Sequence, residues 1–553
     1  MKRNSLTTAV VAGIAGTVGI ANLATAVTTL NPDGLGQVLI YPYYTVNVPN
    51  SLTDDPSNLT TQFSVVNTTN QGKAVKVRFL EGRNSREVRD FNLYLSPFDV
   101  WTATVFKHPD EPQANLLTTD TSCTVPAIRT ATTGASGGAI GELPDGRKFV
   151  RFTNQLFAND PIYGATATSP GRTLANTREG HFEIIEMGVV GNNAGINGGA
   201  AQNSVAAITH NPATGVPANC GKVIGAWGLI PQGYWSADNT VDMNPATGGL
   251  FGSAAIVDGG NGTMLAYSPD AVEGFWAAQG FEHTRPEDTR PSLAQVGFPA
   301  QASVSAVVFR NGQIITASYG TGIAGTRPID AFSALFAHDA IMNEYVLGGG
   351  AAATTDWVVT FPTKGFYVDP QRIGAAPAFA PFVQRYAPAG SCVEVQLTPF
   401  DREERGPGAC TGSDADNPAC DICFSPCEDP EEFVPTLCFE TQVISFQTAA
   451  GFLADPVSPV LGSALARNVD VRADNLFNGW LRVGLNPATQ IHAMATSAEG
   501  VTFFGLPVTG FAASNFVNAN AAPGKLANYS GLWKHKGSRS CTAGTATPTG
   551  ACS

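Results

Sequence analysis

The chain has 553 residues, of which 43% are apolar and only 14% charged, and its net charge is −13 with a sequence pI near 5.0. Such an acidic surface repels phosphate backbones, which argues against nucleic acid as a partner. The 59 glycines and 37 prolines indicate a β-rich protein with many turns, and the length allows two to four domains.

The N-terminus has the pattern of a signal peptide. Lys2-Arg3 precedes an apolar run over residues 9–23, and Ala24-Thr25-Ala26 matches the A-x-A cleavage site. We therefore expect residues 1–26 to be removed on export. No later apolar run reaches the length of a membrane span, so we expect no transmembrane segment after signal cleavage.

Alternating apolar and polar residues predict short antiparallel strands at TQFSVVN (61–67), AVKVRFL (74–80) and FNLYL (91–95). The motif LSPFD (95–99) is echoed by LTPFD (397–401), which suggests an internal repeat. The expected fold is mainly β, with two related immunoglobulin-like, antiparallel β-sandwich modules, a connecting helix and long loops. Residues 27–47 are a further strand-forming segment that could be added to a neighbouring copy.

The domain organisation that we expect has four parts after the signal peptide. They are a first module over 27–265 with a loop-rich insertion at about 123–220, a connector over 266–349, a second module over 350–520, and a tail over 521–553. Apolar residues at helical spacing predict a connector helix over 329–346. The Gly/Asn/Ala-rich stretch 188–219 predicts a long, mobile loop.

Cysteine usage agrees with export, because ten cysteines in an exported chain predict disulfides. Their positions suggest three pairs: Cys123 with Cys220, Cys392 with Cys438, and Cys541 with Cys552, the last closing a loop in the tail. The other four, Cys410, Cys420, Cys423 and Cys427, would then pair locally.

The most specific local cluster is the Cys-rich acidic loop over 410–432. Asp414, Asp416 and Asp421 could hold Ca²⁺, a hard ion that prefers several oxygen ligands, although Pro418 and a missing glycine break the EF-hand pattern. The alternatives are a disulfide-stapled acidic loop without an ion, and zinc, which an oxidising exterior opposes. No other cofactor is expected.

Three sequence motifs lack the context that their chemistry needs. The GxGxxG match over 320–325 is separated from the predicted helix by Pro328, and no second βαβ unit accompanies it. The GxSxG match over 134–138 lacks an apolar strand before it. The LPxTG match over 506–510 is followed by no hydrophobic span, so we read it as a strand, a Gly-Pro kink and a strand.

Titratable residues form no recognisable catalytic or metal pattern. Seven histidines are scattered without metal-binding spacing. The charge-dense stretch over 282–290 could line a site or be a solvated loop. No catalytic or cofactor-binding residue is assigned, and this favours a non-enzymatic protein.

Several runs together resemble a family of exported proteobacterial proteins of uncharacterised function, some labelled as cell-surface proteins. The runs are GQVLIYPYYT (36–45), KVRFLEGRNS (76–85), REGHFEIIEMG (178–188), DWVVTFPTK (356–364) and GLPVTGFA (505–512). The resemblance implies a Gram-negative origin, with the exported chain in the periplasm, on the outer surface or in the medium. It implies no activity and no catalytic residues.

The leading hypothesis is an exported cell-surface or secreted β-protein with a structural or adhesive binding role, whose partners are cell-surface components or further copies of itself. One alternative is an exported hydrolase acting on polysaccharide or peptide. Another is a subunit that assembles into a surface filament or layer.

Overall fold

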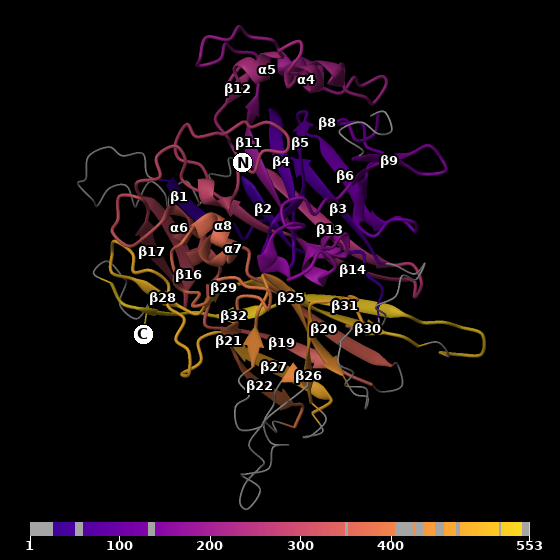
Figure 1. Ribbon diagram of the computed structural model, residues 1–553, viewed down its shortest axis with the longest axis vertical. Helices are drawn as coiled ribbons and strands as arrows, with labels where there is room; N and C mark the ends of the chain where they lie inside the picture. The colour runs from indigo at the N-terminus through magenta and orange to yellow at the C-terminus, as the bar shows by residue number, and fades with distance from the viewer. Residues whose placement is uncertain are drawn as a thin grey trace, which may run out of the picture.

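Two β-sheets form the N-terminal half of the molecule and pack face to face (Figure 1). The computed structural model describes residues 26–49, 59–130, 139–348, 352–403, 424–425, 435–447, 458–471, 476–518, 521–544 and 552. Pairing within these sheets is antiparallel except between β1 and β16. The expected mainly β sandwich architecture is confirmed.

The first sheet has the order β17-β16-β1-β15-β2-β11-β4-β5-β8, with β12 on β11. Its strands are β17 (Gln313–Tyr319), β16 (Val304–Arg310), β1 (Ala26–Leu30), β15 (Asp270–Glu273), β2 (Val38–Thr45), β11 (Glu179–Val190), β4 (Gly72–Glu81), β5 (Glu87–Leu95), β8 (Cys123–Val125) and β12 (Met243–Asn244). The second sheet contains β14 (Thr263–Tyr267), β13 (Leu250–Asp258), β3 (Thr60–Asn67), β6 (Val100–Lys107), β7 (Ala114–Leu117), β10 (Lys148–Arg151) and β9 (Ile140–Glu142), in that order.

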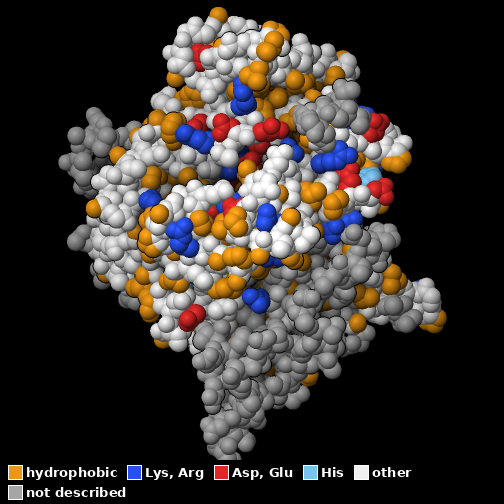
Figure 2. All heavy atoms as spheres, viewed as in Figure 1, with side chains coloured by type: hydrophobic (Ala, Val, Ile, Leu, Met, Phe, Trp, Pro, Cys, Tyr) orange, Lys and Arg blue, Asp and Glu red, His pale blue; other side chains and the backbone are white. Residues whose placement is uncertain are grey.

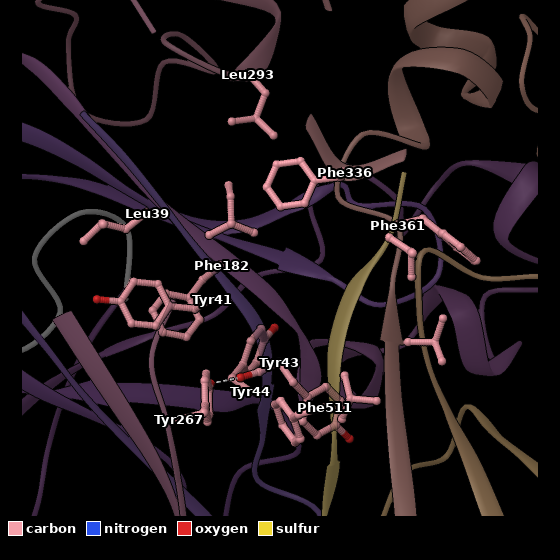
Figure 3. Packing of buried hydrophobic residues seen from close by; sticks show 14 of the residues in the cluster. Leu39, Tyr41, Tyr43, Tyr44, Phe182, Tyr267, Leu293, Phe336, Phe361 and Phe511 are labelled. Atoms are coloured by element: carbon pink, nitrogen blue, oxygen red, sulfur yellow. Dashed lines mark hydrogen bonds between the residues drawn. The ribbon is translucent and has the colours of Figure 1, made fainter. Parts of the chain in front are cut away.

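Aromatic rings fill the space between these two sheets (Figure 3). Phe182 of β11 stacks on Tyr41 of β2, with ring centroids 4.1 Å apart, and lies 4.8 Å from Phe79 of β4. Phe63 of β3 in the facing sheet approaches Phe182 to 4.8 Å. Because all four rings are buried, Phe182 is the centre of the first module's core.

Two further sheets form the C-terminal half (Figure 1). One has the order β23 (Phe424–Ser425), β26 (Ala466–Asp470), β25 (Thr441–Gln447), β20 (Ala353–Thr360), β30 (Thr509–Phe516) and β31 (Tyr529–Lys534), and the other β22 (Gln396–Asp401), β27 (Asn478–Gly484), β19 (Ala340–Val346) and β32 (Lys536–Ser538). Three short pairs complete the described strands: β18 (Ala337–His338) with β29 (Leu506–Pro507), β21 (Val393–Glu394) with β24 (Thr436–Leu437), and β28 (Thr502–Phe504) with β33 (Ser540–Thr542).

The two halves share one apolar core. Tyr267 of β14 lies 5.0 Å from Phe511 of β30, measured between ring centroids. The hydroxyl of Thr360 on β20 donates a hydrogen bond of 2.6 Å to the carbonyl oxygen of Pro42 on β2. One cluster of buried residues runs through both modules, from β2 to β30, and a second cluster lies between the first sheet and the helices that follow β11.

The expected connector differs from the structure in two respects. Helix α6 (Pro328–Phe336) ends ten residues before the predicted end of the 329–346 helix, and residues 340–346 form β19 instead. In this short apolar run helical and strand periodicity cannot be told apart, and pairing with β27 and β32 selects the strand. Strands β15, β16 and β17 of the predicted connector belong to the first sheet, and α6 packs on β16 and β17.

The predicted loop-rich insertion at 123–220 contains β11, which lies in the middle of the first sheet between β2 and β4. All twelve residues of β11 are buried, so both faces of this strand are covered. The sequence of a strand that is covered on both faces lacks the regular alternation of apolar and polar residues. Residues 179–190 are therefore a central strand of the first sheet and not a loop within the expected loop-rich insertion.

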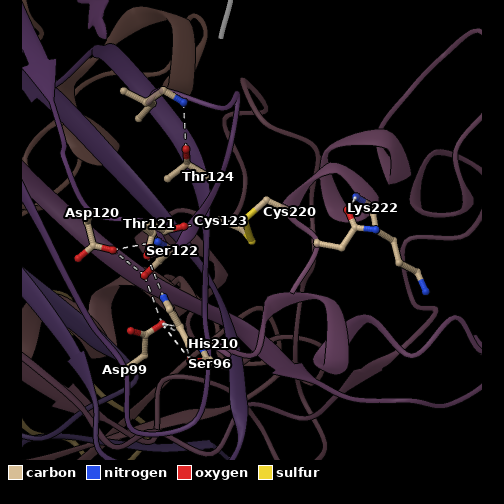
Figure 4. Close-up of a disulfide and its surroundings, with 12 residues drawn as sticks. Ser96, Asp99, Asp120, Thr121, Ser122, Cys123, Thr124, His210, Cys220 and Lys222 are labelled. Atoms are coloured by element: carbon tan, nitrogen blue, oxygen red, sulfur yellow. Dashed lines mark hydrogen bonds and ion pairs between the residues drawn. A yellow bond between two sulfur atoms is a disulfide. The ribbon is translucent and has the colours of Figure 1, made fainter. Parts of the chain in front are cut away.

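A small helical cap follows β11 and covers one end of the first sheet (Figure 1). It contains α3 (Ser204–Ile208), α4 (Cys220–Ala226) and α5 (Tyr234–Ala237). Of these only α3 lies in the stretch 188–219, so part of the predicted long loop is helical. The Cys123–Cys220 disulfide joins α4 to β8, beside a polar cluster in which His210 Nδ1 lies 2.9 Å from Ser96 Oγ (Figure 4).

The structure also forms the expected Cys392–Cys438 and Cys541–Cys552 disulfides. The remaining cysteines, and the calcium candidates Asp414, Asp416 and Asp421, lie outside the described residues. The LPVTG motif falls in β29 and β30, with Leu506 and Val508 buried, as the strand interpretation predicts. The LSPFD echo is a turn at 95–99 but part of β22 at 397–401, so the two copies differ in structure.

Residues 27–47 are not available for donation to another copy. Within its own chain β1 pairs with β15 and β16, and β2 pairs with β15 and β11. Both edges of each strand are thereby occupied.

The remaining described helices are short: η1 (Pro161–Tyr163), η2 (Pro170–Arg172), η3 (Leu174–Thr177), η4 (Leu293–Gln295), α7 (Gly365–Val368) and α8 (Pro370–Ile373).

Candidate functional site

A cleft of about 590 Å³ lies where the first module meets α6, α7 and α8. Figure 2 shows basic and acidic side chains gathered in a band across this face, below the helical cap. The cleft is lined by five arginines and two carboxylates, namely Arg78, Arg86, Arg290, Arg327, Arg372, Glu87 and Asp369. This is a marked concentration of guanidinium groups in a chain with only 32 lysines and arginines.

Two of these arginines are committed to buried ion pairs. Arg86, in the β4–β5 hairpin, donates from Nη2 to Asp369 Oδ1 at 3.0 Å and from Nε to Asp369 Oδ2 at 3.2 Å. Its Nη1 contacts Asp160 Oδ2 at 2.6 Å. Arg78 of β4 pairs with Glu87 of β5 at 2.8 Å and with Glu183 of β11. These pairs hold the walls of the cleft in place.

Arg372 on α8 differs from its neighbours because it forms no ion pair with any residue in the described part of the chain. Its side chain is exposed and stacks on Phe366, with the guanidinium carbon 4.3 Å from the ring centroid. Nη2 donates to the carbonyl oxygen of Ser85 at 3.0 Å. This geometry fixes the guanidinium plane at the cleft and leaves donors for an incoming anion.

Arg327, at the start of α6, is held in a similar way. Its guanidinium lies 4.4 Å from the ring of Tyr367 and 4.2 Å from that of Phe379. Nη1 donates to the carbonyl oxygen of Phe366, and Asp330 is 3.5 Å from Nη2. The two rings hold the guanidinium in place, and Asp330 forms a longer ion pair with it.

A buried polar layer lies beneath Arg372. Gly365 has no side chain, and the Arg372 guanidinium and the Glu440 carboxylate pack directly against it. A β-carbon at this position would lie too close to both, at 2.9 Å from Arg372 Nη1 and 3.0 Å from Glu440 Oε2. Burial raises the pKa of Glu440, an effect that Arg372 opposes, and burial lowers the pKa of nearby Lys364. Ser85, next to this layer, is buried with a left-handed φ of 50°. Such strained polar surroundings are common at binding sites.

The cleft continues into a second hollow of about 440 Å³, which shares Glu87, Leu156 and Thr289 with it. Arg89 and Arg151 line this second part. Burial, with a smaller contribution from Asp90, raises the pKa of Glu87 to about 7, and the ion pair with Arg78 opposes this shift. We call the two hollows together the arginine groove. Because the two hollows adjoin, the groove has room for more than one unit of a polymer.

The sequence-predicted charged stretch over 282–290 contributes to this groove in part. Arg290 lines the first hollow and pairs with Glu282, and Glu287 lines the second. His283 lies away from both, buried between the cap and the sheet, where Nε2 accepts from Tyr94 Oη at 3.0 Å and Nδ1 donates to the carbonyl oxygen of Asn239 at 3.0 Å. It is a structural residue.

The other sequence motifs do not form sites. The glycines over 320–325 connect β17 to α6, but β17 is antiparallel to β16, so the parallel βαβ unit of a dinucleotide site is missing there. The GxSxG match at 134–138 lies outside the described residues. Within the described ranges, no three His, Cys, Asp or Glu side chains are grouped closely enough to hold a metal ion.

His283 provides a test of the buried cap. Burial lowers its pKa to about 3, and Lys76 adds to this effect. Because the unfolded pKa is about 6.5, the unfolded chain binds the proton between pH 6.5 and 3 while the native chain does not, so native stability falls as the pH drops through this window. Relative to His283→Gln, we expect the wild type to lose about 1.4 kcal/mol of unfolding free energy per pH unit between pH 6 and 4.

Urea unfolding at several pH values measures this difference, and ¹⁵N NMR of the histidine ring gives the native protonation state directly. We expect the ring of His283 to stay neutral at pH 5. A native titration midpoint near pH 6.5 would contradict the buried, fully hydrogen-bonded environment.

Comparison with known proteins gives no match: no family model, no curated protein and no solved structure is similar to this chain. Of the described helices, none is long and apolar enough to cross a membrane.

Proposed function

We propose that this chain is an exported, cell-surface or secreted binding protein that holds an acidic polysaccharide, with uronic acid carboxylates on Arg372 and Arg327. The observation that carries the proposal is Arg372: an exposed guanidinium, stacked on Phe366 and without an ion-pair partner among the described residues. Guanidinium forks match the two oxygens of a carboxylate and bind it more strongly than neutral donors do.

Shape and compartment support this choice of ligand. The two hollows adjoin beside the first module's hairpin and offer space for several sugar residues. Three disulfides and the N-terminal signal pattern are in keeping with an exported protein that meets such polymers outside the cell. In a protein with a net charge of −13, a local guanidinium cluster also selects where an anion binds.

A binding function is favoured over a hydrolase because the acidic side chains of the cleft are paired with arginines. Asp369 accepts both hydrogen bonds of Arg86, and Glu87 is paired with Arg78. Both carboxylates of the cleft wall are therefore engaged with structural arginines, and neither is placed as a free acid or nucleophile for a glycosidic bond.

Isothermal titration of the mature protein with hexagalacturonate tests the proposal. We expect saturable binding that weakens with salt, and an affinity at least about tenfold lower for Arg372→Gln. Arg147→Gln is the matched control, since Arg147 is an exposed arginine outside the groove, paired with Asp145. It should bind as the wild type does.

Absence of hexagalacturonate binding, or equal affinity in Arg372→Gln, would overturn the proposal. Binding of an acidic peptide in place of the oligosaccharide would assign the groove to a protein partner, and this too would contradict the acidic polysaccharide. Circular dichroism of each variant separates loss of binding from loss of folding.

A further inference from the structure

The outward face of four strands in the second sheet carries no charged residue. Strands β6, β3, β13 and β14 are neighbours in this sheet (Figure 1). Cross-strand pairing places Phe251 beside Val66, and Val66 beside Val100. In the next row, the hydroxyl oxygens of Ser64 and Ser253 are 3.0 Å apart. We call this surface the uncharged sheet face, and its residues are Thr60, Gln62, Ser64, Val66, Val100, Thr102, Thr104, Phe106, Phe251, Ser253, Ala255, Val257, Met264 and Ala266.

Burial along the strands shows that these side chains point away from the core. The residues between them, such as Phe63 and Trp101, are buried between the two sheets of the first module. On the outward side Phe251 is 41%, Val100 48% and Met264 57% exposed. The solvent face of an antiparallel sheet is usually polar. A broad exposed face with large apolar side chains and no charge therefore marks an interaction surface.

A strained turn adds a further aromatic ring at one end of this face. Phe98, in the turn before β6, is 70% exposed, and its backbone has a left-handed φ of 58°, which is unfavourable for a bulky residue. Its N–H donates to the carbonyl oxygen of Thr69 at 3.0 Å, and this bond holds the turn. Neither the strain nor the exposed ring stabilises the isolated chain, which favours a role in binding.

Charge favours a second copy of this chain as the partner. With a net charge of −13, two copies repel each other over most of their surfaces. This repulsion is weakest where carboxylates are missing, and burying an uncharged face leaves no ion without a partner. The hydroxyl groups of the face, including those of Ser64 and Ser253, can both donate and accept hydrogen bonds, so the face is complementary to itself about a twofold axis.

The area and shape of the face suit a dimer. Four strands about 4.8 Å apart and about 26 Å long give about 500 Å² on each copy and about 1,000 Å² in total, which is the lower limit for a specific interface. Along β13 the small residues Ser253 and Ala255 are central, and Phe251 and Met264 lie towards opposite ends of the face. Large side chains of one copy can therefore lie over small ones of the other, as in two packed sheets.

We propose that two copies of this chain form a symmetric dimer through the uncharged sheet face, with the strands of one copy packed face to face on those of the other. The arginine groove is lined by other residues, and none of them belongs to this face. The dimer therefore carries two grooves. The inference does not depend on what those grooves bind.

Sedimentation velocity of residues 27–553 at concentrations up to about 100 µM tests the dimer. We expect a monomer–dimer equilibrium that shifts towards the dimer as salt is added, because screening weakens the repulsion between two acidic copies. Ser253→Lys places a cation from each copy in the desolvated interface and should weaken dimerisation at least about a hundredfold. Phe251→Ala should weaken it about tenfold, and this variant decides the question if Ser253→Lys does not fold.

Two control variants should dimerise as the wild type does. Ser253→Thr keeps the centre of the face uncharged, and Phe309→Lys adds a charge at an exposed position of the first sheet, outside the face. Circular dichroism checks that each variant is folded.

The proposal is overturned if the chain stays monomeric over the whole concentration range, or if folded Ser253→Lys dimerises as tightly as the wild type. Loss of the dimer in Phe309→Lys would assign the contact to the first sheet and would also overturn it. A monomer that is depleted from solution by microcrystalline cellulose or chitin, but not when it carries Ser253→Lys, would assign the face to a polysaccharide surface and contradict the dimer.

Discussion

Arg86→Ala is expected to lower the free energy of unfolding by about 3–5 kcal/mol, because it leaves a buried carboxylate without its counter-ion. The side chains of Arg86 and Asp369 are only 3% and 2% exposed, and two hydrogen bonds join them across the boundary between the modules. Arg86 also contacts Asp160 and the carbonyl oxygen of Leu156. Urea unfolding followed by tryptophan fluorescence measures the loss.

The matched control is Arg147→Ala, which removes a fully solvated pair with Asp145 and should leave the urea midpoint close to that of the wild type. Replacing both buried partners, as Arg86→Met with Asp369→Leu, should recover much of the loss, since an apolar pair leaves no buried charge. If Arg86→Ala unfolds within about 1 kcal/mol of the wild type, the ion pair does not join the modules as described.

Phe182→Ala is expected to cost about 3–5 kcal/mol through lost apolar contact and the cavity that remains. The ring lies at the centre of β11 and contacts Tyr41, Phe63 and Phe79 within 4.8 Å between centroids. Partners from both sheets would lose packing at once. Chemical denaturation again gives the value, and near-ultraviolet circular dichroism reports whether the neighbouring tyrosines remain ordered.

Phe309→Ala serves as the comparison, because Phe309 is a strand residue of the same sheet but is 68% exposed. Its replacement should change stability by no more than about 0.5 kcal/mol. Equal destabilisation by the two substitutions would show that Phe182 is not at the centre of the core.

Local sequence patterns predict the strands of this fold well where one face is buried. The alternation in 61–67 corresponds to β3, whose burial follows the same period. Prediction is poorer where tertiary contacts decide. Residues 340–346 have helical spacing but pair with β27, and β11 is covered on both faces, so its place at the centre of the sheet cannot be read from alternation.

The arginine groove could not be located from the sequence, because its walls come from distant segments. Arg86 and Asp369 are 283 residues apart, and no motif links them. The one available signal is Arg83, Arg86 and Arg89 within seven residues of a chain that is only 14% charged. Such a local concentration marks the hairpin as unusual, but the partners on α6 and α8 become apparent only when the modules are placed together.

The arginine groove between the modules is the proposed ligand site, and it is built around Arg372. A crystal structure of residues 27–553 grown with trigalacturonate shows whether a sugar binds there. We expect a uronate carboxylate within hydrogen-bonding distance of the Arg372 guanidinium, with the rest of the sugar in the arginine groove. Trigalacturonate bound only elsewhere, or no sugar in the groove at saturating concentration, would contradict it.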